Sequence, residues 1–422
     1  MLLNRARAGE LMRQHGLDAL VATTPVNVTY FSDYACWLAP GFKEYMVAPG
    51  GSSERVLQNF ALLPLEAEPA LVLEPLWAVN ASDLWVTDLV LAGDADFERA
   101  DGAGELPEAL GRIFELLRNA ERSETPVEGL ARALTARGLG ESRIGIELEG
   151  LPAETRDEIA GRVPRAAIAD CTNLLRLIRA VKSDEELVRL ERSAAIAEQA
   201  ATESLDGAKP GRPVAELVEI FRARAAQLGA DFDHFAFGPR GLGIATEPRY
   251  ILAEGDVLFV DFGCVYRGYY SDSGTTLSVG EPSPSTLERY SALRGTIEAG
   301  RTAMRPGILA STVRAAMWEA LTAEGITESF PHGHGLGLEL RDYPIVVPDN
   351  GRRIRDECVD VPSDLPLEEG MVVNLEVPVF TLGQSSIHCE RTFVVTAEGC
   401  RPLTEQRRDL PAGPDGLGEV RS

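Results

Sequence analysis

Lysine is nearly absent from this sequence. Among 422 residues only Lys43, Lys182 and Lys209 are lysines, so arginine carries almost all of the positive charge. Acidic residues outnumber basic ones by 65 to 41, and the formal net charge at pH 7 is -24. Nucleic acids and anionic membranes are bound through basic patches, which neutralise their phosphates. We therefore expect neither a nucleic acid nor a membrane as a partner.

Long apolar runs are missing as well. No segment approaches the roughly 18–20 apolar residues that a membrane-spanning helix requires. Residues 1–22 carry charges where a secretory signal would have an uninterrupted apolar block, so we expect a cytoplasmic protein. The six cysteines are scattered, without a Cys-x-x-Cys pair. This spacing predicts reduced thiols and no zinc cluster.

The first part of the chain alternates helix-like and strand-like segments, which is typical of an α/β domain. Its apolar patterns predict helices over residues 5–16, 106–120 and 126–140 and strands over residues 17–24, 27–34, 69–76 and 143–150. A long amphipathic stretch follows, in which Ser183 and Glu186 have the spacing of a capping box. We place a domain junction near residues 172–183.

A second domain is expected after this junction. Its patterns predict several strand pairs and helices over residues 211–229, 285–304 and 310–324. The last residues are rich in Pro, Gly and Asp, a composition typical of disorder. The predicted ranges are 1–172 for the first domain, 173–410 for the second and 411–422 for a disordered tail.

Two aspartates interrupt an apolar strand pair of this second domain. Residues 255–280 predict a β-hairpin with its turn near Tyr266–Gly268, and Asp261 and Asp272 lie on either side of that turn. Cross-strand neighbours have Cβ atoms about 4.5–5.5 Å apart, so two aspartates placed there would repel unless a cation lay between them. The alternative is that Asp261 only ends the strand as a turn former.

A second predicted hairpin has the same design. It covers residues 370–396, and Glu376 and Glu390 flank a turn centred on Gly383. Each acid interrupts an apolar strand, where an unpaired carboxylate is costly. Two hairpins with the same pattern favour a shared cation site over two unrelated turns.

Between the two hairpins, residues 330–344 hold His332 and His334 in a glycine-rich segment. Glycines let the backbone pass close to a site. Four carboxylates and one imidazole suit Mn²⁺, Fe²⁺, Co²⁺ or Zn²⁺. Two such ions roughly 3.5–4 Å apart can activate a bridging water and polarise a carbonyl. His15 and His234 are expected to be structural or surface residues.

Five motifs, in this order, resemble the metal motifs of the creatinase/prolidase family of metallohydrolases. They are VDFG (260–263), YYSDSGTT (269–276), GHGLGLEL (333–340), NLEVPVF (374–380) and HCERTFVVT (388–396). Residues 17–34 resemble the start of the family's N-terminal domain, and residues 176–200 resemble the helix that opens its catalytic domain. The resemblance implies an α/β N-terminal creatinase-like domain plus an α+β pita-bread catalytic domain, in a homodimer.

The resemblance also implies roles for individual residues. Asp261 would bind the first of two divalent metal ions (Mn, Co, Fe or Zn), and Asp272 and Glu390 would bridge both ions. His334 and Glu376 would complete the second metal position. Glu376 would also relay the proton of the attacking water.

Three positions depart from the peptidases of the family. The histidine that usually precedes the first aspartate falls near Ile244, the second histidine of the glycine-rich motif is replaced by Arg341, and the usual arginine before the last glutamate is His388. Drift at tolerant positions is one interpretation. A changed substrate is the other, because Arg341 could clamp a carboxylate bidentately and has no proton to donate.

We therefore predict a dinuclear-metal hydrolase that cleaves a C–N bond and resembles an Xaa-Pro dipeptidase. Its substrate would be a dipeptide or a small carboxylate-bearing molecule such as an ectoine-like compound. Catalysis is assigned to Glu376 and Arg341, and substrate binding to Arg341, His332 and His388. His332 could instead only hydrogen-bond the backbone. Two alternatives stay open: a metal-dependent lyase acting on a small sulfonium or related substrate, and a non-catalytic binding protein of the same fold.

Overall fold

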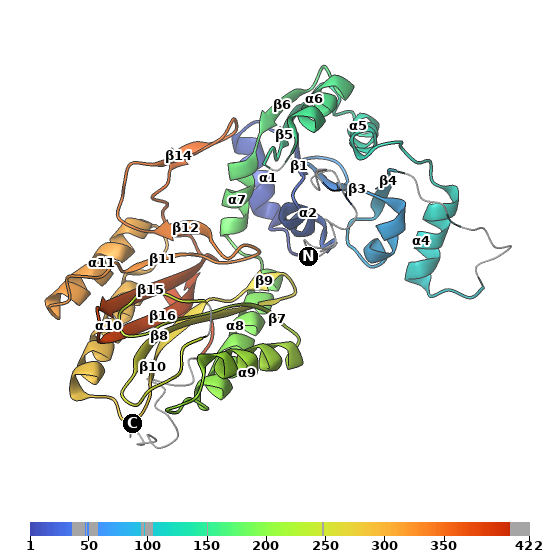
Figure 1. The fold of residues 1–422 in the computed structure, drawn as a ribbon. Helices are drawn as coiled ribbons and strands as arrows, with labels where there is room; N and C mark the ends of the chain where they lie inside the picture. The colour runs from blue at the N-terminus through green and yellow to red at the C-terminus, as the bar shows by residue number, and fades with distance from the viewer. Residues whose placement is uncertain are drawn as a thin grey trace. The chain divides into compact units, whose positions relative to one another are not determined.

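The computed structural model folds into two compact units, coloured along the chain in Figure 1. The structure describes residues 1–35, 47, 49, 58–93, 97, 104–149, 151–246 and 249–405. The first unit comprises Met1–Ile178 and Ile354–Val361, and the second comprises Arg179–Arg353 and Pro362–Ser422. The boundary predicted at residue 172 falls at the first residue of helix α7 (Thr172–Ala180). The predicted tail, 411–422, lies outside the described residues.

The first unit is built on a six-stranded sheet in the order β4-β3-β2-β1-β5-β6. Its strands are β1 (Ala19–Ala22), β2 (Phe60–Pro64), β3 (Ala70–Leu73), β4 (Asp88–Leu91), β5 (Arg143–Ile146) and β6 (Ala167–Asp170). Its other helices are α1 (Arg5–Gln14), α2 (Pro25–Ser32), the 3-10 helix η1 (Pro75–Ala81), α4 (Glu108–Asn119), α5 (Pro126–Ala136) and α6 (Ala153–Arg162). Strand β1 pairs in parallel with β5, and Leu130 and Leu134 of α5 pack into the core of this sheet with Val72. The α/β class predicted for this part is confirmed.

The strand predicted over residues 27–34 is wrong, because this segment forms helix α2. Thr24 caps the helix by accepting a hydrogen bond from the backbone N–H of Asn27, and Pro25 occupies the first helical turn. Both are ordinary signals of a helix start. The β-branched and aromatic residues that suggested a strand are buried instead on the helix.

The second unit is built on a nine-stranded sheet. Seven strands follow the order β12-β11-β15-β16-β10-β8-β7, while β17 pairs with β16 and β9 with β8. The strands are β7 (Asp231–Gly238), β8 (Val257–Tyr266), β9 (Tyr269–Tyr270), β10 (Ser273–Ser278), β11 (His332–Gly335), β12 (Asp342–Val346), β15 (Val372–Thr381), β16 (Ser385–Thr396) and β17 (Gly399–Pro402). The helices are α8 (Asp184–Leu205), α9 (Val214–Gln227), α10 (Pro284–Ala303) and α11 (Ala310–Ala323). The short strands β13 (Arg353–Arg355) and β14 (Asp360–Pro362) pair with each other.

The helices of this unit explain why acids are tolerated in its apolar strands. Leu375 and Val377 of β15 pack into one core cluster with residues of α10 and α11. Phe262 of β8 packs into a second cluster with residues of α8 and α9. Successive residues of a strand point to opposite faces. Glu376 and Asp261 therefore point to the face of the sheet opposite these cores.

The predicted local signals of this unit are present. The capping box of Ser183 and Glu186 starts helix α8. The first hairpin turns at Arg267 and Gly268, which both have positive φ angles, as the tight turn of a two-residue hairpin requires. Among the described residues, none of the helices has both the length and the apolar composition needed to cross a bilayer.

Candidate metal centre

One row of residues crosses the large sheet from strand to strand. From β11 to β8, His332 pairs with Glu376, Glu376 with Glu390, Glu390 with Gly274, and Gly274 with Asp261. Side chains paired in register point to the same face of a sheet. The absence of a side chain at Gly274 leaves the space that the acids occupy, since a Cβ there would lie 2.5 Å from Oε2 of Glu390.

The acids of the two hairpins are arranged differently. Glu376 and Glu390 are direct cross-strand neighbours, as the predicted turn at Gly383 requires. Asp261 instead faces Gly274, and Asp272 lies just before β10, two residues ahead of that glycine. Because side chains two residues apart in an extended chain share a face, Asp272 still points into the row.

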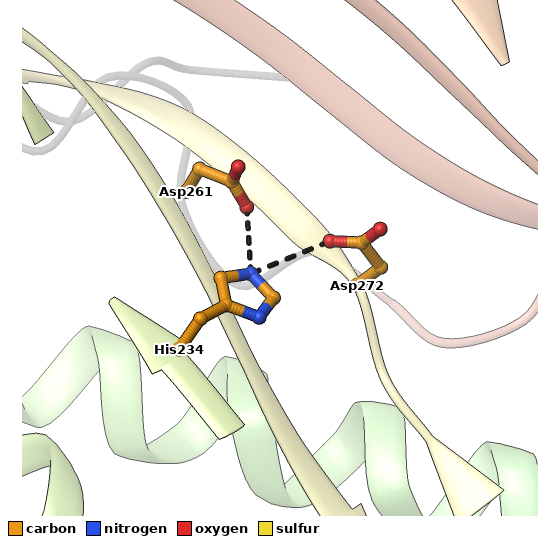
Figure 2. A group of neighbouring side chains, drawn as sticks. All are labelled: His234, Asp261 and Asp272. Carbon is orange, nitrogen blue, oxygen red and sulfur yellow. Dashed lines mark hydrogen bonds and ion pairs between the residues drawn. The ribbon is translucent and has the colours of Figure 1, made fainter. Parts of the chain in front are cut away.

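Two histidines contact the aspartates. Nε2 of His334 lies 3.2 Å from Oδ2 of Asp272. Figure 2 shows His234, on β7, turned toward both Asp261 and Asp272. Nε2 of His234 lies 2.9 Å from Oδ1 of Asp261 and 3.5 Å from Oδ1 of Asp272, and its Nδ1 lies 2.7 Å from Oδ2 of Asp233.

His234 was expected from the sequence to be a structural or surface residue. The structure places its ring in the wall of the same cavity as the acids. A signal existed in the segment Asp231–Gly238, whose apolar residues suit a strand next to the first hairpin. The register of that strand includes a bulge between Phe232 and His234, which apolar periodicity does not reveal.

Four carboxylates this close change one another's pKa values. Burial, reinforced by the charges of Asp272 and Asp261, raises the pKa of Glu390 well above its ordinary range. Burial also raises the pKa of Asp261, against the effect of its hydrogen bond with His234. Burial acts to raise the pKa of Asp272 as well. The contacts of Asp272 with His234 and His334 outweigh this effect and lower its pKa.

This donor set fits divalent metal ions. Two groups of donor atoms each lie within 4.8 Å of one another: His234, Asp261 and Asp272, and Glu376, His388 and Glu390. Carboxylate oxygens and imidazole nitrogens suit first-row divalent metals. A divalent cation among these atoms would compensate the repulsion and the desolvation that raise the pKa of Glu390.

Two buried side chains contact the carboxylate of Glu390. Asn374 donates from Nδ2 to Oε1 of Glu390, and Nε2 of His388 lies 2.9 Å from Oε2. Burial lowers the pKa of His388 to about 4, so its ring is neutral at pH 7. His388 has no exposed surface and does not line the cavity. His388 is thus placed to orient Glu390, and the substrate-binding role expected for it stays a prediction.

A cavity of about 330 Å³ opens over the row of acids. Its remaining walls are mostly apolar and are formed by Ile244, Phe259, Phe330, Leu340 and Pro378. This volume is suited to a small ligand. Ile244, near which the histidine of the family's peptidases was expected from the sequence, lines the cavity with an apolar side chain.

Arg341 and His332 lie at one side of this cavity. The side chain of Arg341 is 60% exposed, and its Nη2 lies 3.7 Å from Oε1 of Glu376. Nε2 of His332 lies 2.8 Å from the same oxygen, and its Nδ1 lies 2.8 Å from the carbonyl oxygen of Phe330. His332 thus makes the backbone contact that the sequence left open and also lines the cavity, while its contact with a substrate stays a prediction. Although burial opposes it, the contact with His332 lowers the pKa of Glu376.

The turn that carries Arg341 is anchored by buried charges. Oδ2 of Asp342 lies 3.2 Å from Nζ of Lys182, and Oδ1 lies 3.5 Å from Nη2 of Arg179. Arg179 also pairs with Glu339. Burial acts to raise the pKa of Asp342, but Lys182 and Arg179 hold it below its ordinary value. The backbone is therefore fixed on both sides of Arg341.

Two family models match the chain. One describes the creatinase/prolidase N-terminal domain and matches residues 5–181, and the other describes metallopeptidase family M24 and matches residues 188–397. An Xaa-Pro dipeptidase of Lactobacillus delbrueckii subsp. lactis is 23% identical, over 98% of this chain and 99% of the relative. The uncharacterized peptidase YqhT of Bacillus subtilis is 28% identical, over 65% of this chain and 76% of the relative.

Solved structures share the whole architecture. A dipeptidase from Pyrococcus horikoshii matches with a TM-score of 0.71 at 20% identity and covers 97% of this chain and 99% of its own. An Xaa-Pro dipeptidase from Bacillus anthracis matches with a TM-score of 0.71 at 20% identity, over 97% of this chain and 98% of its own. Together with the family models, these likenesses confirm the creatinase-like domain and the pita-bread domain.

Proposed function

Because the chain belongs to metallopeptidase family M24, whose members are metal-dependent hydrolases, we propose that it uses two divalent ions to cleave a C–N bond in a small carboxylate-bearing amide. The observation that carries this proposal is the row of carboxylates and histidines across one face of the sheet, beneath a small cavity. Nothing in the site selects an ectoine-like compound over other amides of this class.

The proposed ligands are Asp261, Asp272, His334, Glu376 and Glu390. When bound, two ions between these residues supply Lewis acidity, which activates a water molecule and polarises the scissile carbonyl. Glu376 faces the cavity as a charged carboxylate and would take up the proton of the attacking water, then return it to the leaving nitrogen. The apolar wall would exclude bulk water, and Arg341 would bind the carboxylate of the substrate.

Solvent-isotope labelling and metal analysis test the reaction class. We expect purified protein to contain divalent metal and to place solvent ¹⁸O in the new carboxylate of the product. A product formed without solvent oxygen would favour the lyase. Protein that binds no divalent ion and turns over no amide would favour the binding protein. The homodimer expected from the sequence stays a prediction that light scattering can check.

Glu376→Gln is expected to lower kcat on the order of 10²-fold, the low end of what a positioned acid or base contributes. Glutamine keeps the shape of the side chain and one metal-binding oxygen, but it cannot carry a proton. Steady-state kinetics with saturating metal provide the measurement, and Glu376→Asp is the matched control that should retain more activity. A kcat equal to that of the wild type would remove Glu376 from proton transfer.

Arg341→Met is expected to lower kcat/KM for acidic substrates by about 10-fold. This corresponds to about 1.5 kcal/mol, the low end for a hydrogen bond to a charged group, because Arg341 is largely exposed. The measurement compares an Xaa-Pro dipeptide with its C-terminal amide, and the amide should be affected little. The kcat/KM of Arg341→Lys for the acid should lie between those of the wild type and Arg341→Met, because lysine keeps the charge and loses the planar guanidinium.

Two results would contradict the role of Arg341. One is an equal loss on the acid and on the amide. The other is a kcat/KM for the acid that Arg341→Met leaves unchanged, since that would mean that Arg341 does not bind the carboxylate.

A further inference from the structure

We infer that His234 is a metal ligand, so that each of the two proposed metal positions has an imidazole of its own. The inference rests on the proposed dinuclear centre and adds a sixth ligand from β7. The five ligands predicted from the sequence include no residue of that strand.

Asp272 stands between two histidines. Its Oδ2 lies 3.2 Å from Nε2 of His334, and its Oδ1 lies 3.5 Å from Nε2 of His234. A carboxylate that bridges two ions turns one oxygen toward each of them. The two imidazoles lie beside different oxygens of Asp272, and they would therefore serve different ions.

The spacing around His234 suits ligands of a single ion. Ligand atoms about 2.1 Å from a metal lie about 3.0 Å apart at octahedral angles and about 3.4 Å apart at tetrahedral angles. Nε2 of His234 lies 2.9 Å from Oδ1 of Asp261 and 3.5 Å from Oδ1 of Asp272. All three donor atoms lie within 4.8 Å of one another, so one ion can contact all of them. Figure 2 shows the ring of His234 turned toward both carboxylates, which come from β8 and from the residue before β10.

An acid orients the imidazole of His234. Its Nδ1 lies 2.7 Å from Oδ2 of Asp233, so Nδ1–H can donate to that carboxylate and leave the lone pair of Nε2 for a metal. Metal-bound histidines are usually oriented in this way by a carboxylate or a carbonyl. The other histidine of the centre follows the same pattern, because Nδ1 of His334 lies 2.9 Å from the carbonyl oxygen of Gly335.

Two local features of the fold make this arrangement possible. The pairing of β7 with β8 slips at Asp233, since Phe232 pairs with Cys264 and His234 pairs with Gly263. This bulge lets two consecutive side chains meet, whereas they would point to opposite faces of a regular strand. Gly263 leaves room for the ring, because a Cβ there would lie 2.5 Å from Cε1 of His234.

Cobalt titration of the metal-free protein tests the inference. X-ray absorption on the Co²⁺-loaded wild type should count two imidazoles for two ions, and His234→Ala should retain one. The affinity for one of the two ions should fall at least about 10-fold in His234→Ala. Asp233→Asn should keep both imidazoles and weaken the same ion by about 10- to 100-fold, as expected when the residue that orients a ligand is changed.

Asp231→Asn is the matched control. Asp231 is exposed on the same strand, and this substitution makes the same change of charge and side chain as Asp233→Asn. The control should leave both affinities unchanged. An equal weakening by Asp231→Asn would overturn the role of Asp233, because it would reflect long-range charge alone.

An unchanged imidazole count together with unchanged affinities in His234→Ala would overturn the inference and leave His234 as an ion-pair partner of Asp261. If the wild type itself takes up no Co²⁺, the proposed function fails together with the inference. If the wild type binds two ions but X-ray absorption counts one imidazole, the inference fails while the proposed function stands. Near-ultraviolet circular dichroism shows whether His234→Ala folds. If it does not fold, the Co²⁺ titration of Asp233→Asn tests the inference instead.

Discussion

Glu390→Gln is expected to lose at least about 10³-fold in kcat/KM and to bind less metal than the wild type. Glu390 is central to the row, facing Glu376 on β15 and Gly274 on β10, and is 1% exposed. Removing a carboxylate that is proposed to bridge two ions would take away much of the several kcal/mol that metal Lewis acidity supplies, and each 1.36 kcal/mol is about tenfold in rate. Kinetics and elemental analysis measure both effects.

The same substitution should stabilise the protein when it is free of metal. Burial and neighbouring carboxylates raise the pKa of Glu390. A carboxyl with a raised folded-state pKa stabilises the fold below its unfolded-state pKa, and this contribution is lost as the pH rises through the folded-state pKa. Glutamine carries no charge to desolvate. The Tm of the metal-free variant should therefore exceed that of the metal-free wild type more at pH 7 than at pH 5.

A matched control separates the site from general charge removal. Glu398 is exposed in the turn after β16, and Glu398→Gln should change neither the metal content nor the activity. Two results would count against the proposed centre: full metal content in Glu390→Gln, or a Tm of the metal-free variant below that of the metal-free wild type.

Lys182→Met is expected to lower the free energy of unfolding by about 3 kcal/mol. Removing one partner of a buried ion pair leaves the other charge uncompensated and typically costs about 3–5 kcal/mol. The low end applies because Arg179 still lies 3.5 Å from Asp342. Methionine preserves the buried aliphatic stem, so the loss reports the charge rather than a cavity. Urea unfolding of the wild type and the variant provides the measurement.

The pH dependence of this loss has a defined sign. Lys182 and Arg179 hold the pKa of Asp342 below its ordinary value. The stability that this pair contributes is therefore present above the unfolded-state pKa and is lost as the pH falls through the folded-state pKa. The gap between wild type and variant should therefore be wide at pH 7 and should narrow only below the unfolded-state pKa of about 3.9, for example at pH 3.

The double variant Lys182→Met/Asp342→Asn should recover part of the loss, because no unpaired charge is left buried. A gap of the same size at both pH values, with no recovery in the double variant, would show that the ion pair is not the cause.

The sequence was most informative where a signal is local. Each hairpin could be predicted because two acids lie at matched distances from a turn within one stretch of chain, and the register of Glu376 and Glu390 agrees. The helix start at Ser183 was equally local. Residues 27–34 were predicted wrongly because β-branched residues outweighed the capping signal of Thr24 and Pro25.

The complete row could not be predicted from the residues alone, because it depends on which strands become neighbours. Strand β16 of one hairpin pairs with β10 of the other, and β11 completes the row beside β15. The position of His234 depends in addition on a bulge at Asp233. The burial of His388 depends on packing as well, and its position two residues before Glu390 does not reveal it. These features arise from long-range packing rather than from local pattern.

Lys182 offers a buried amine through which local opening of the second unit can be followed chemically. Its side chain is only 1% exposed and its amine contacts Asp342, so an acylating reagent can react with it only when this region opens. The chain has just two other lysines, Lys43 and Lys209, and arginine does not react in the same way. The rate of acylation at Lys182 therefore reports how often the turn that carries Arg341 opens locally. It does so at a single residue.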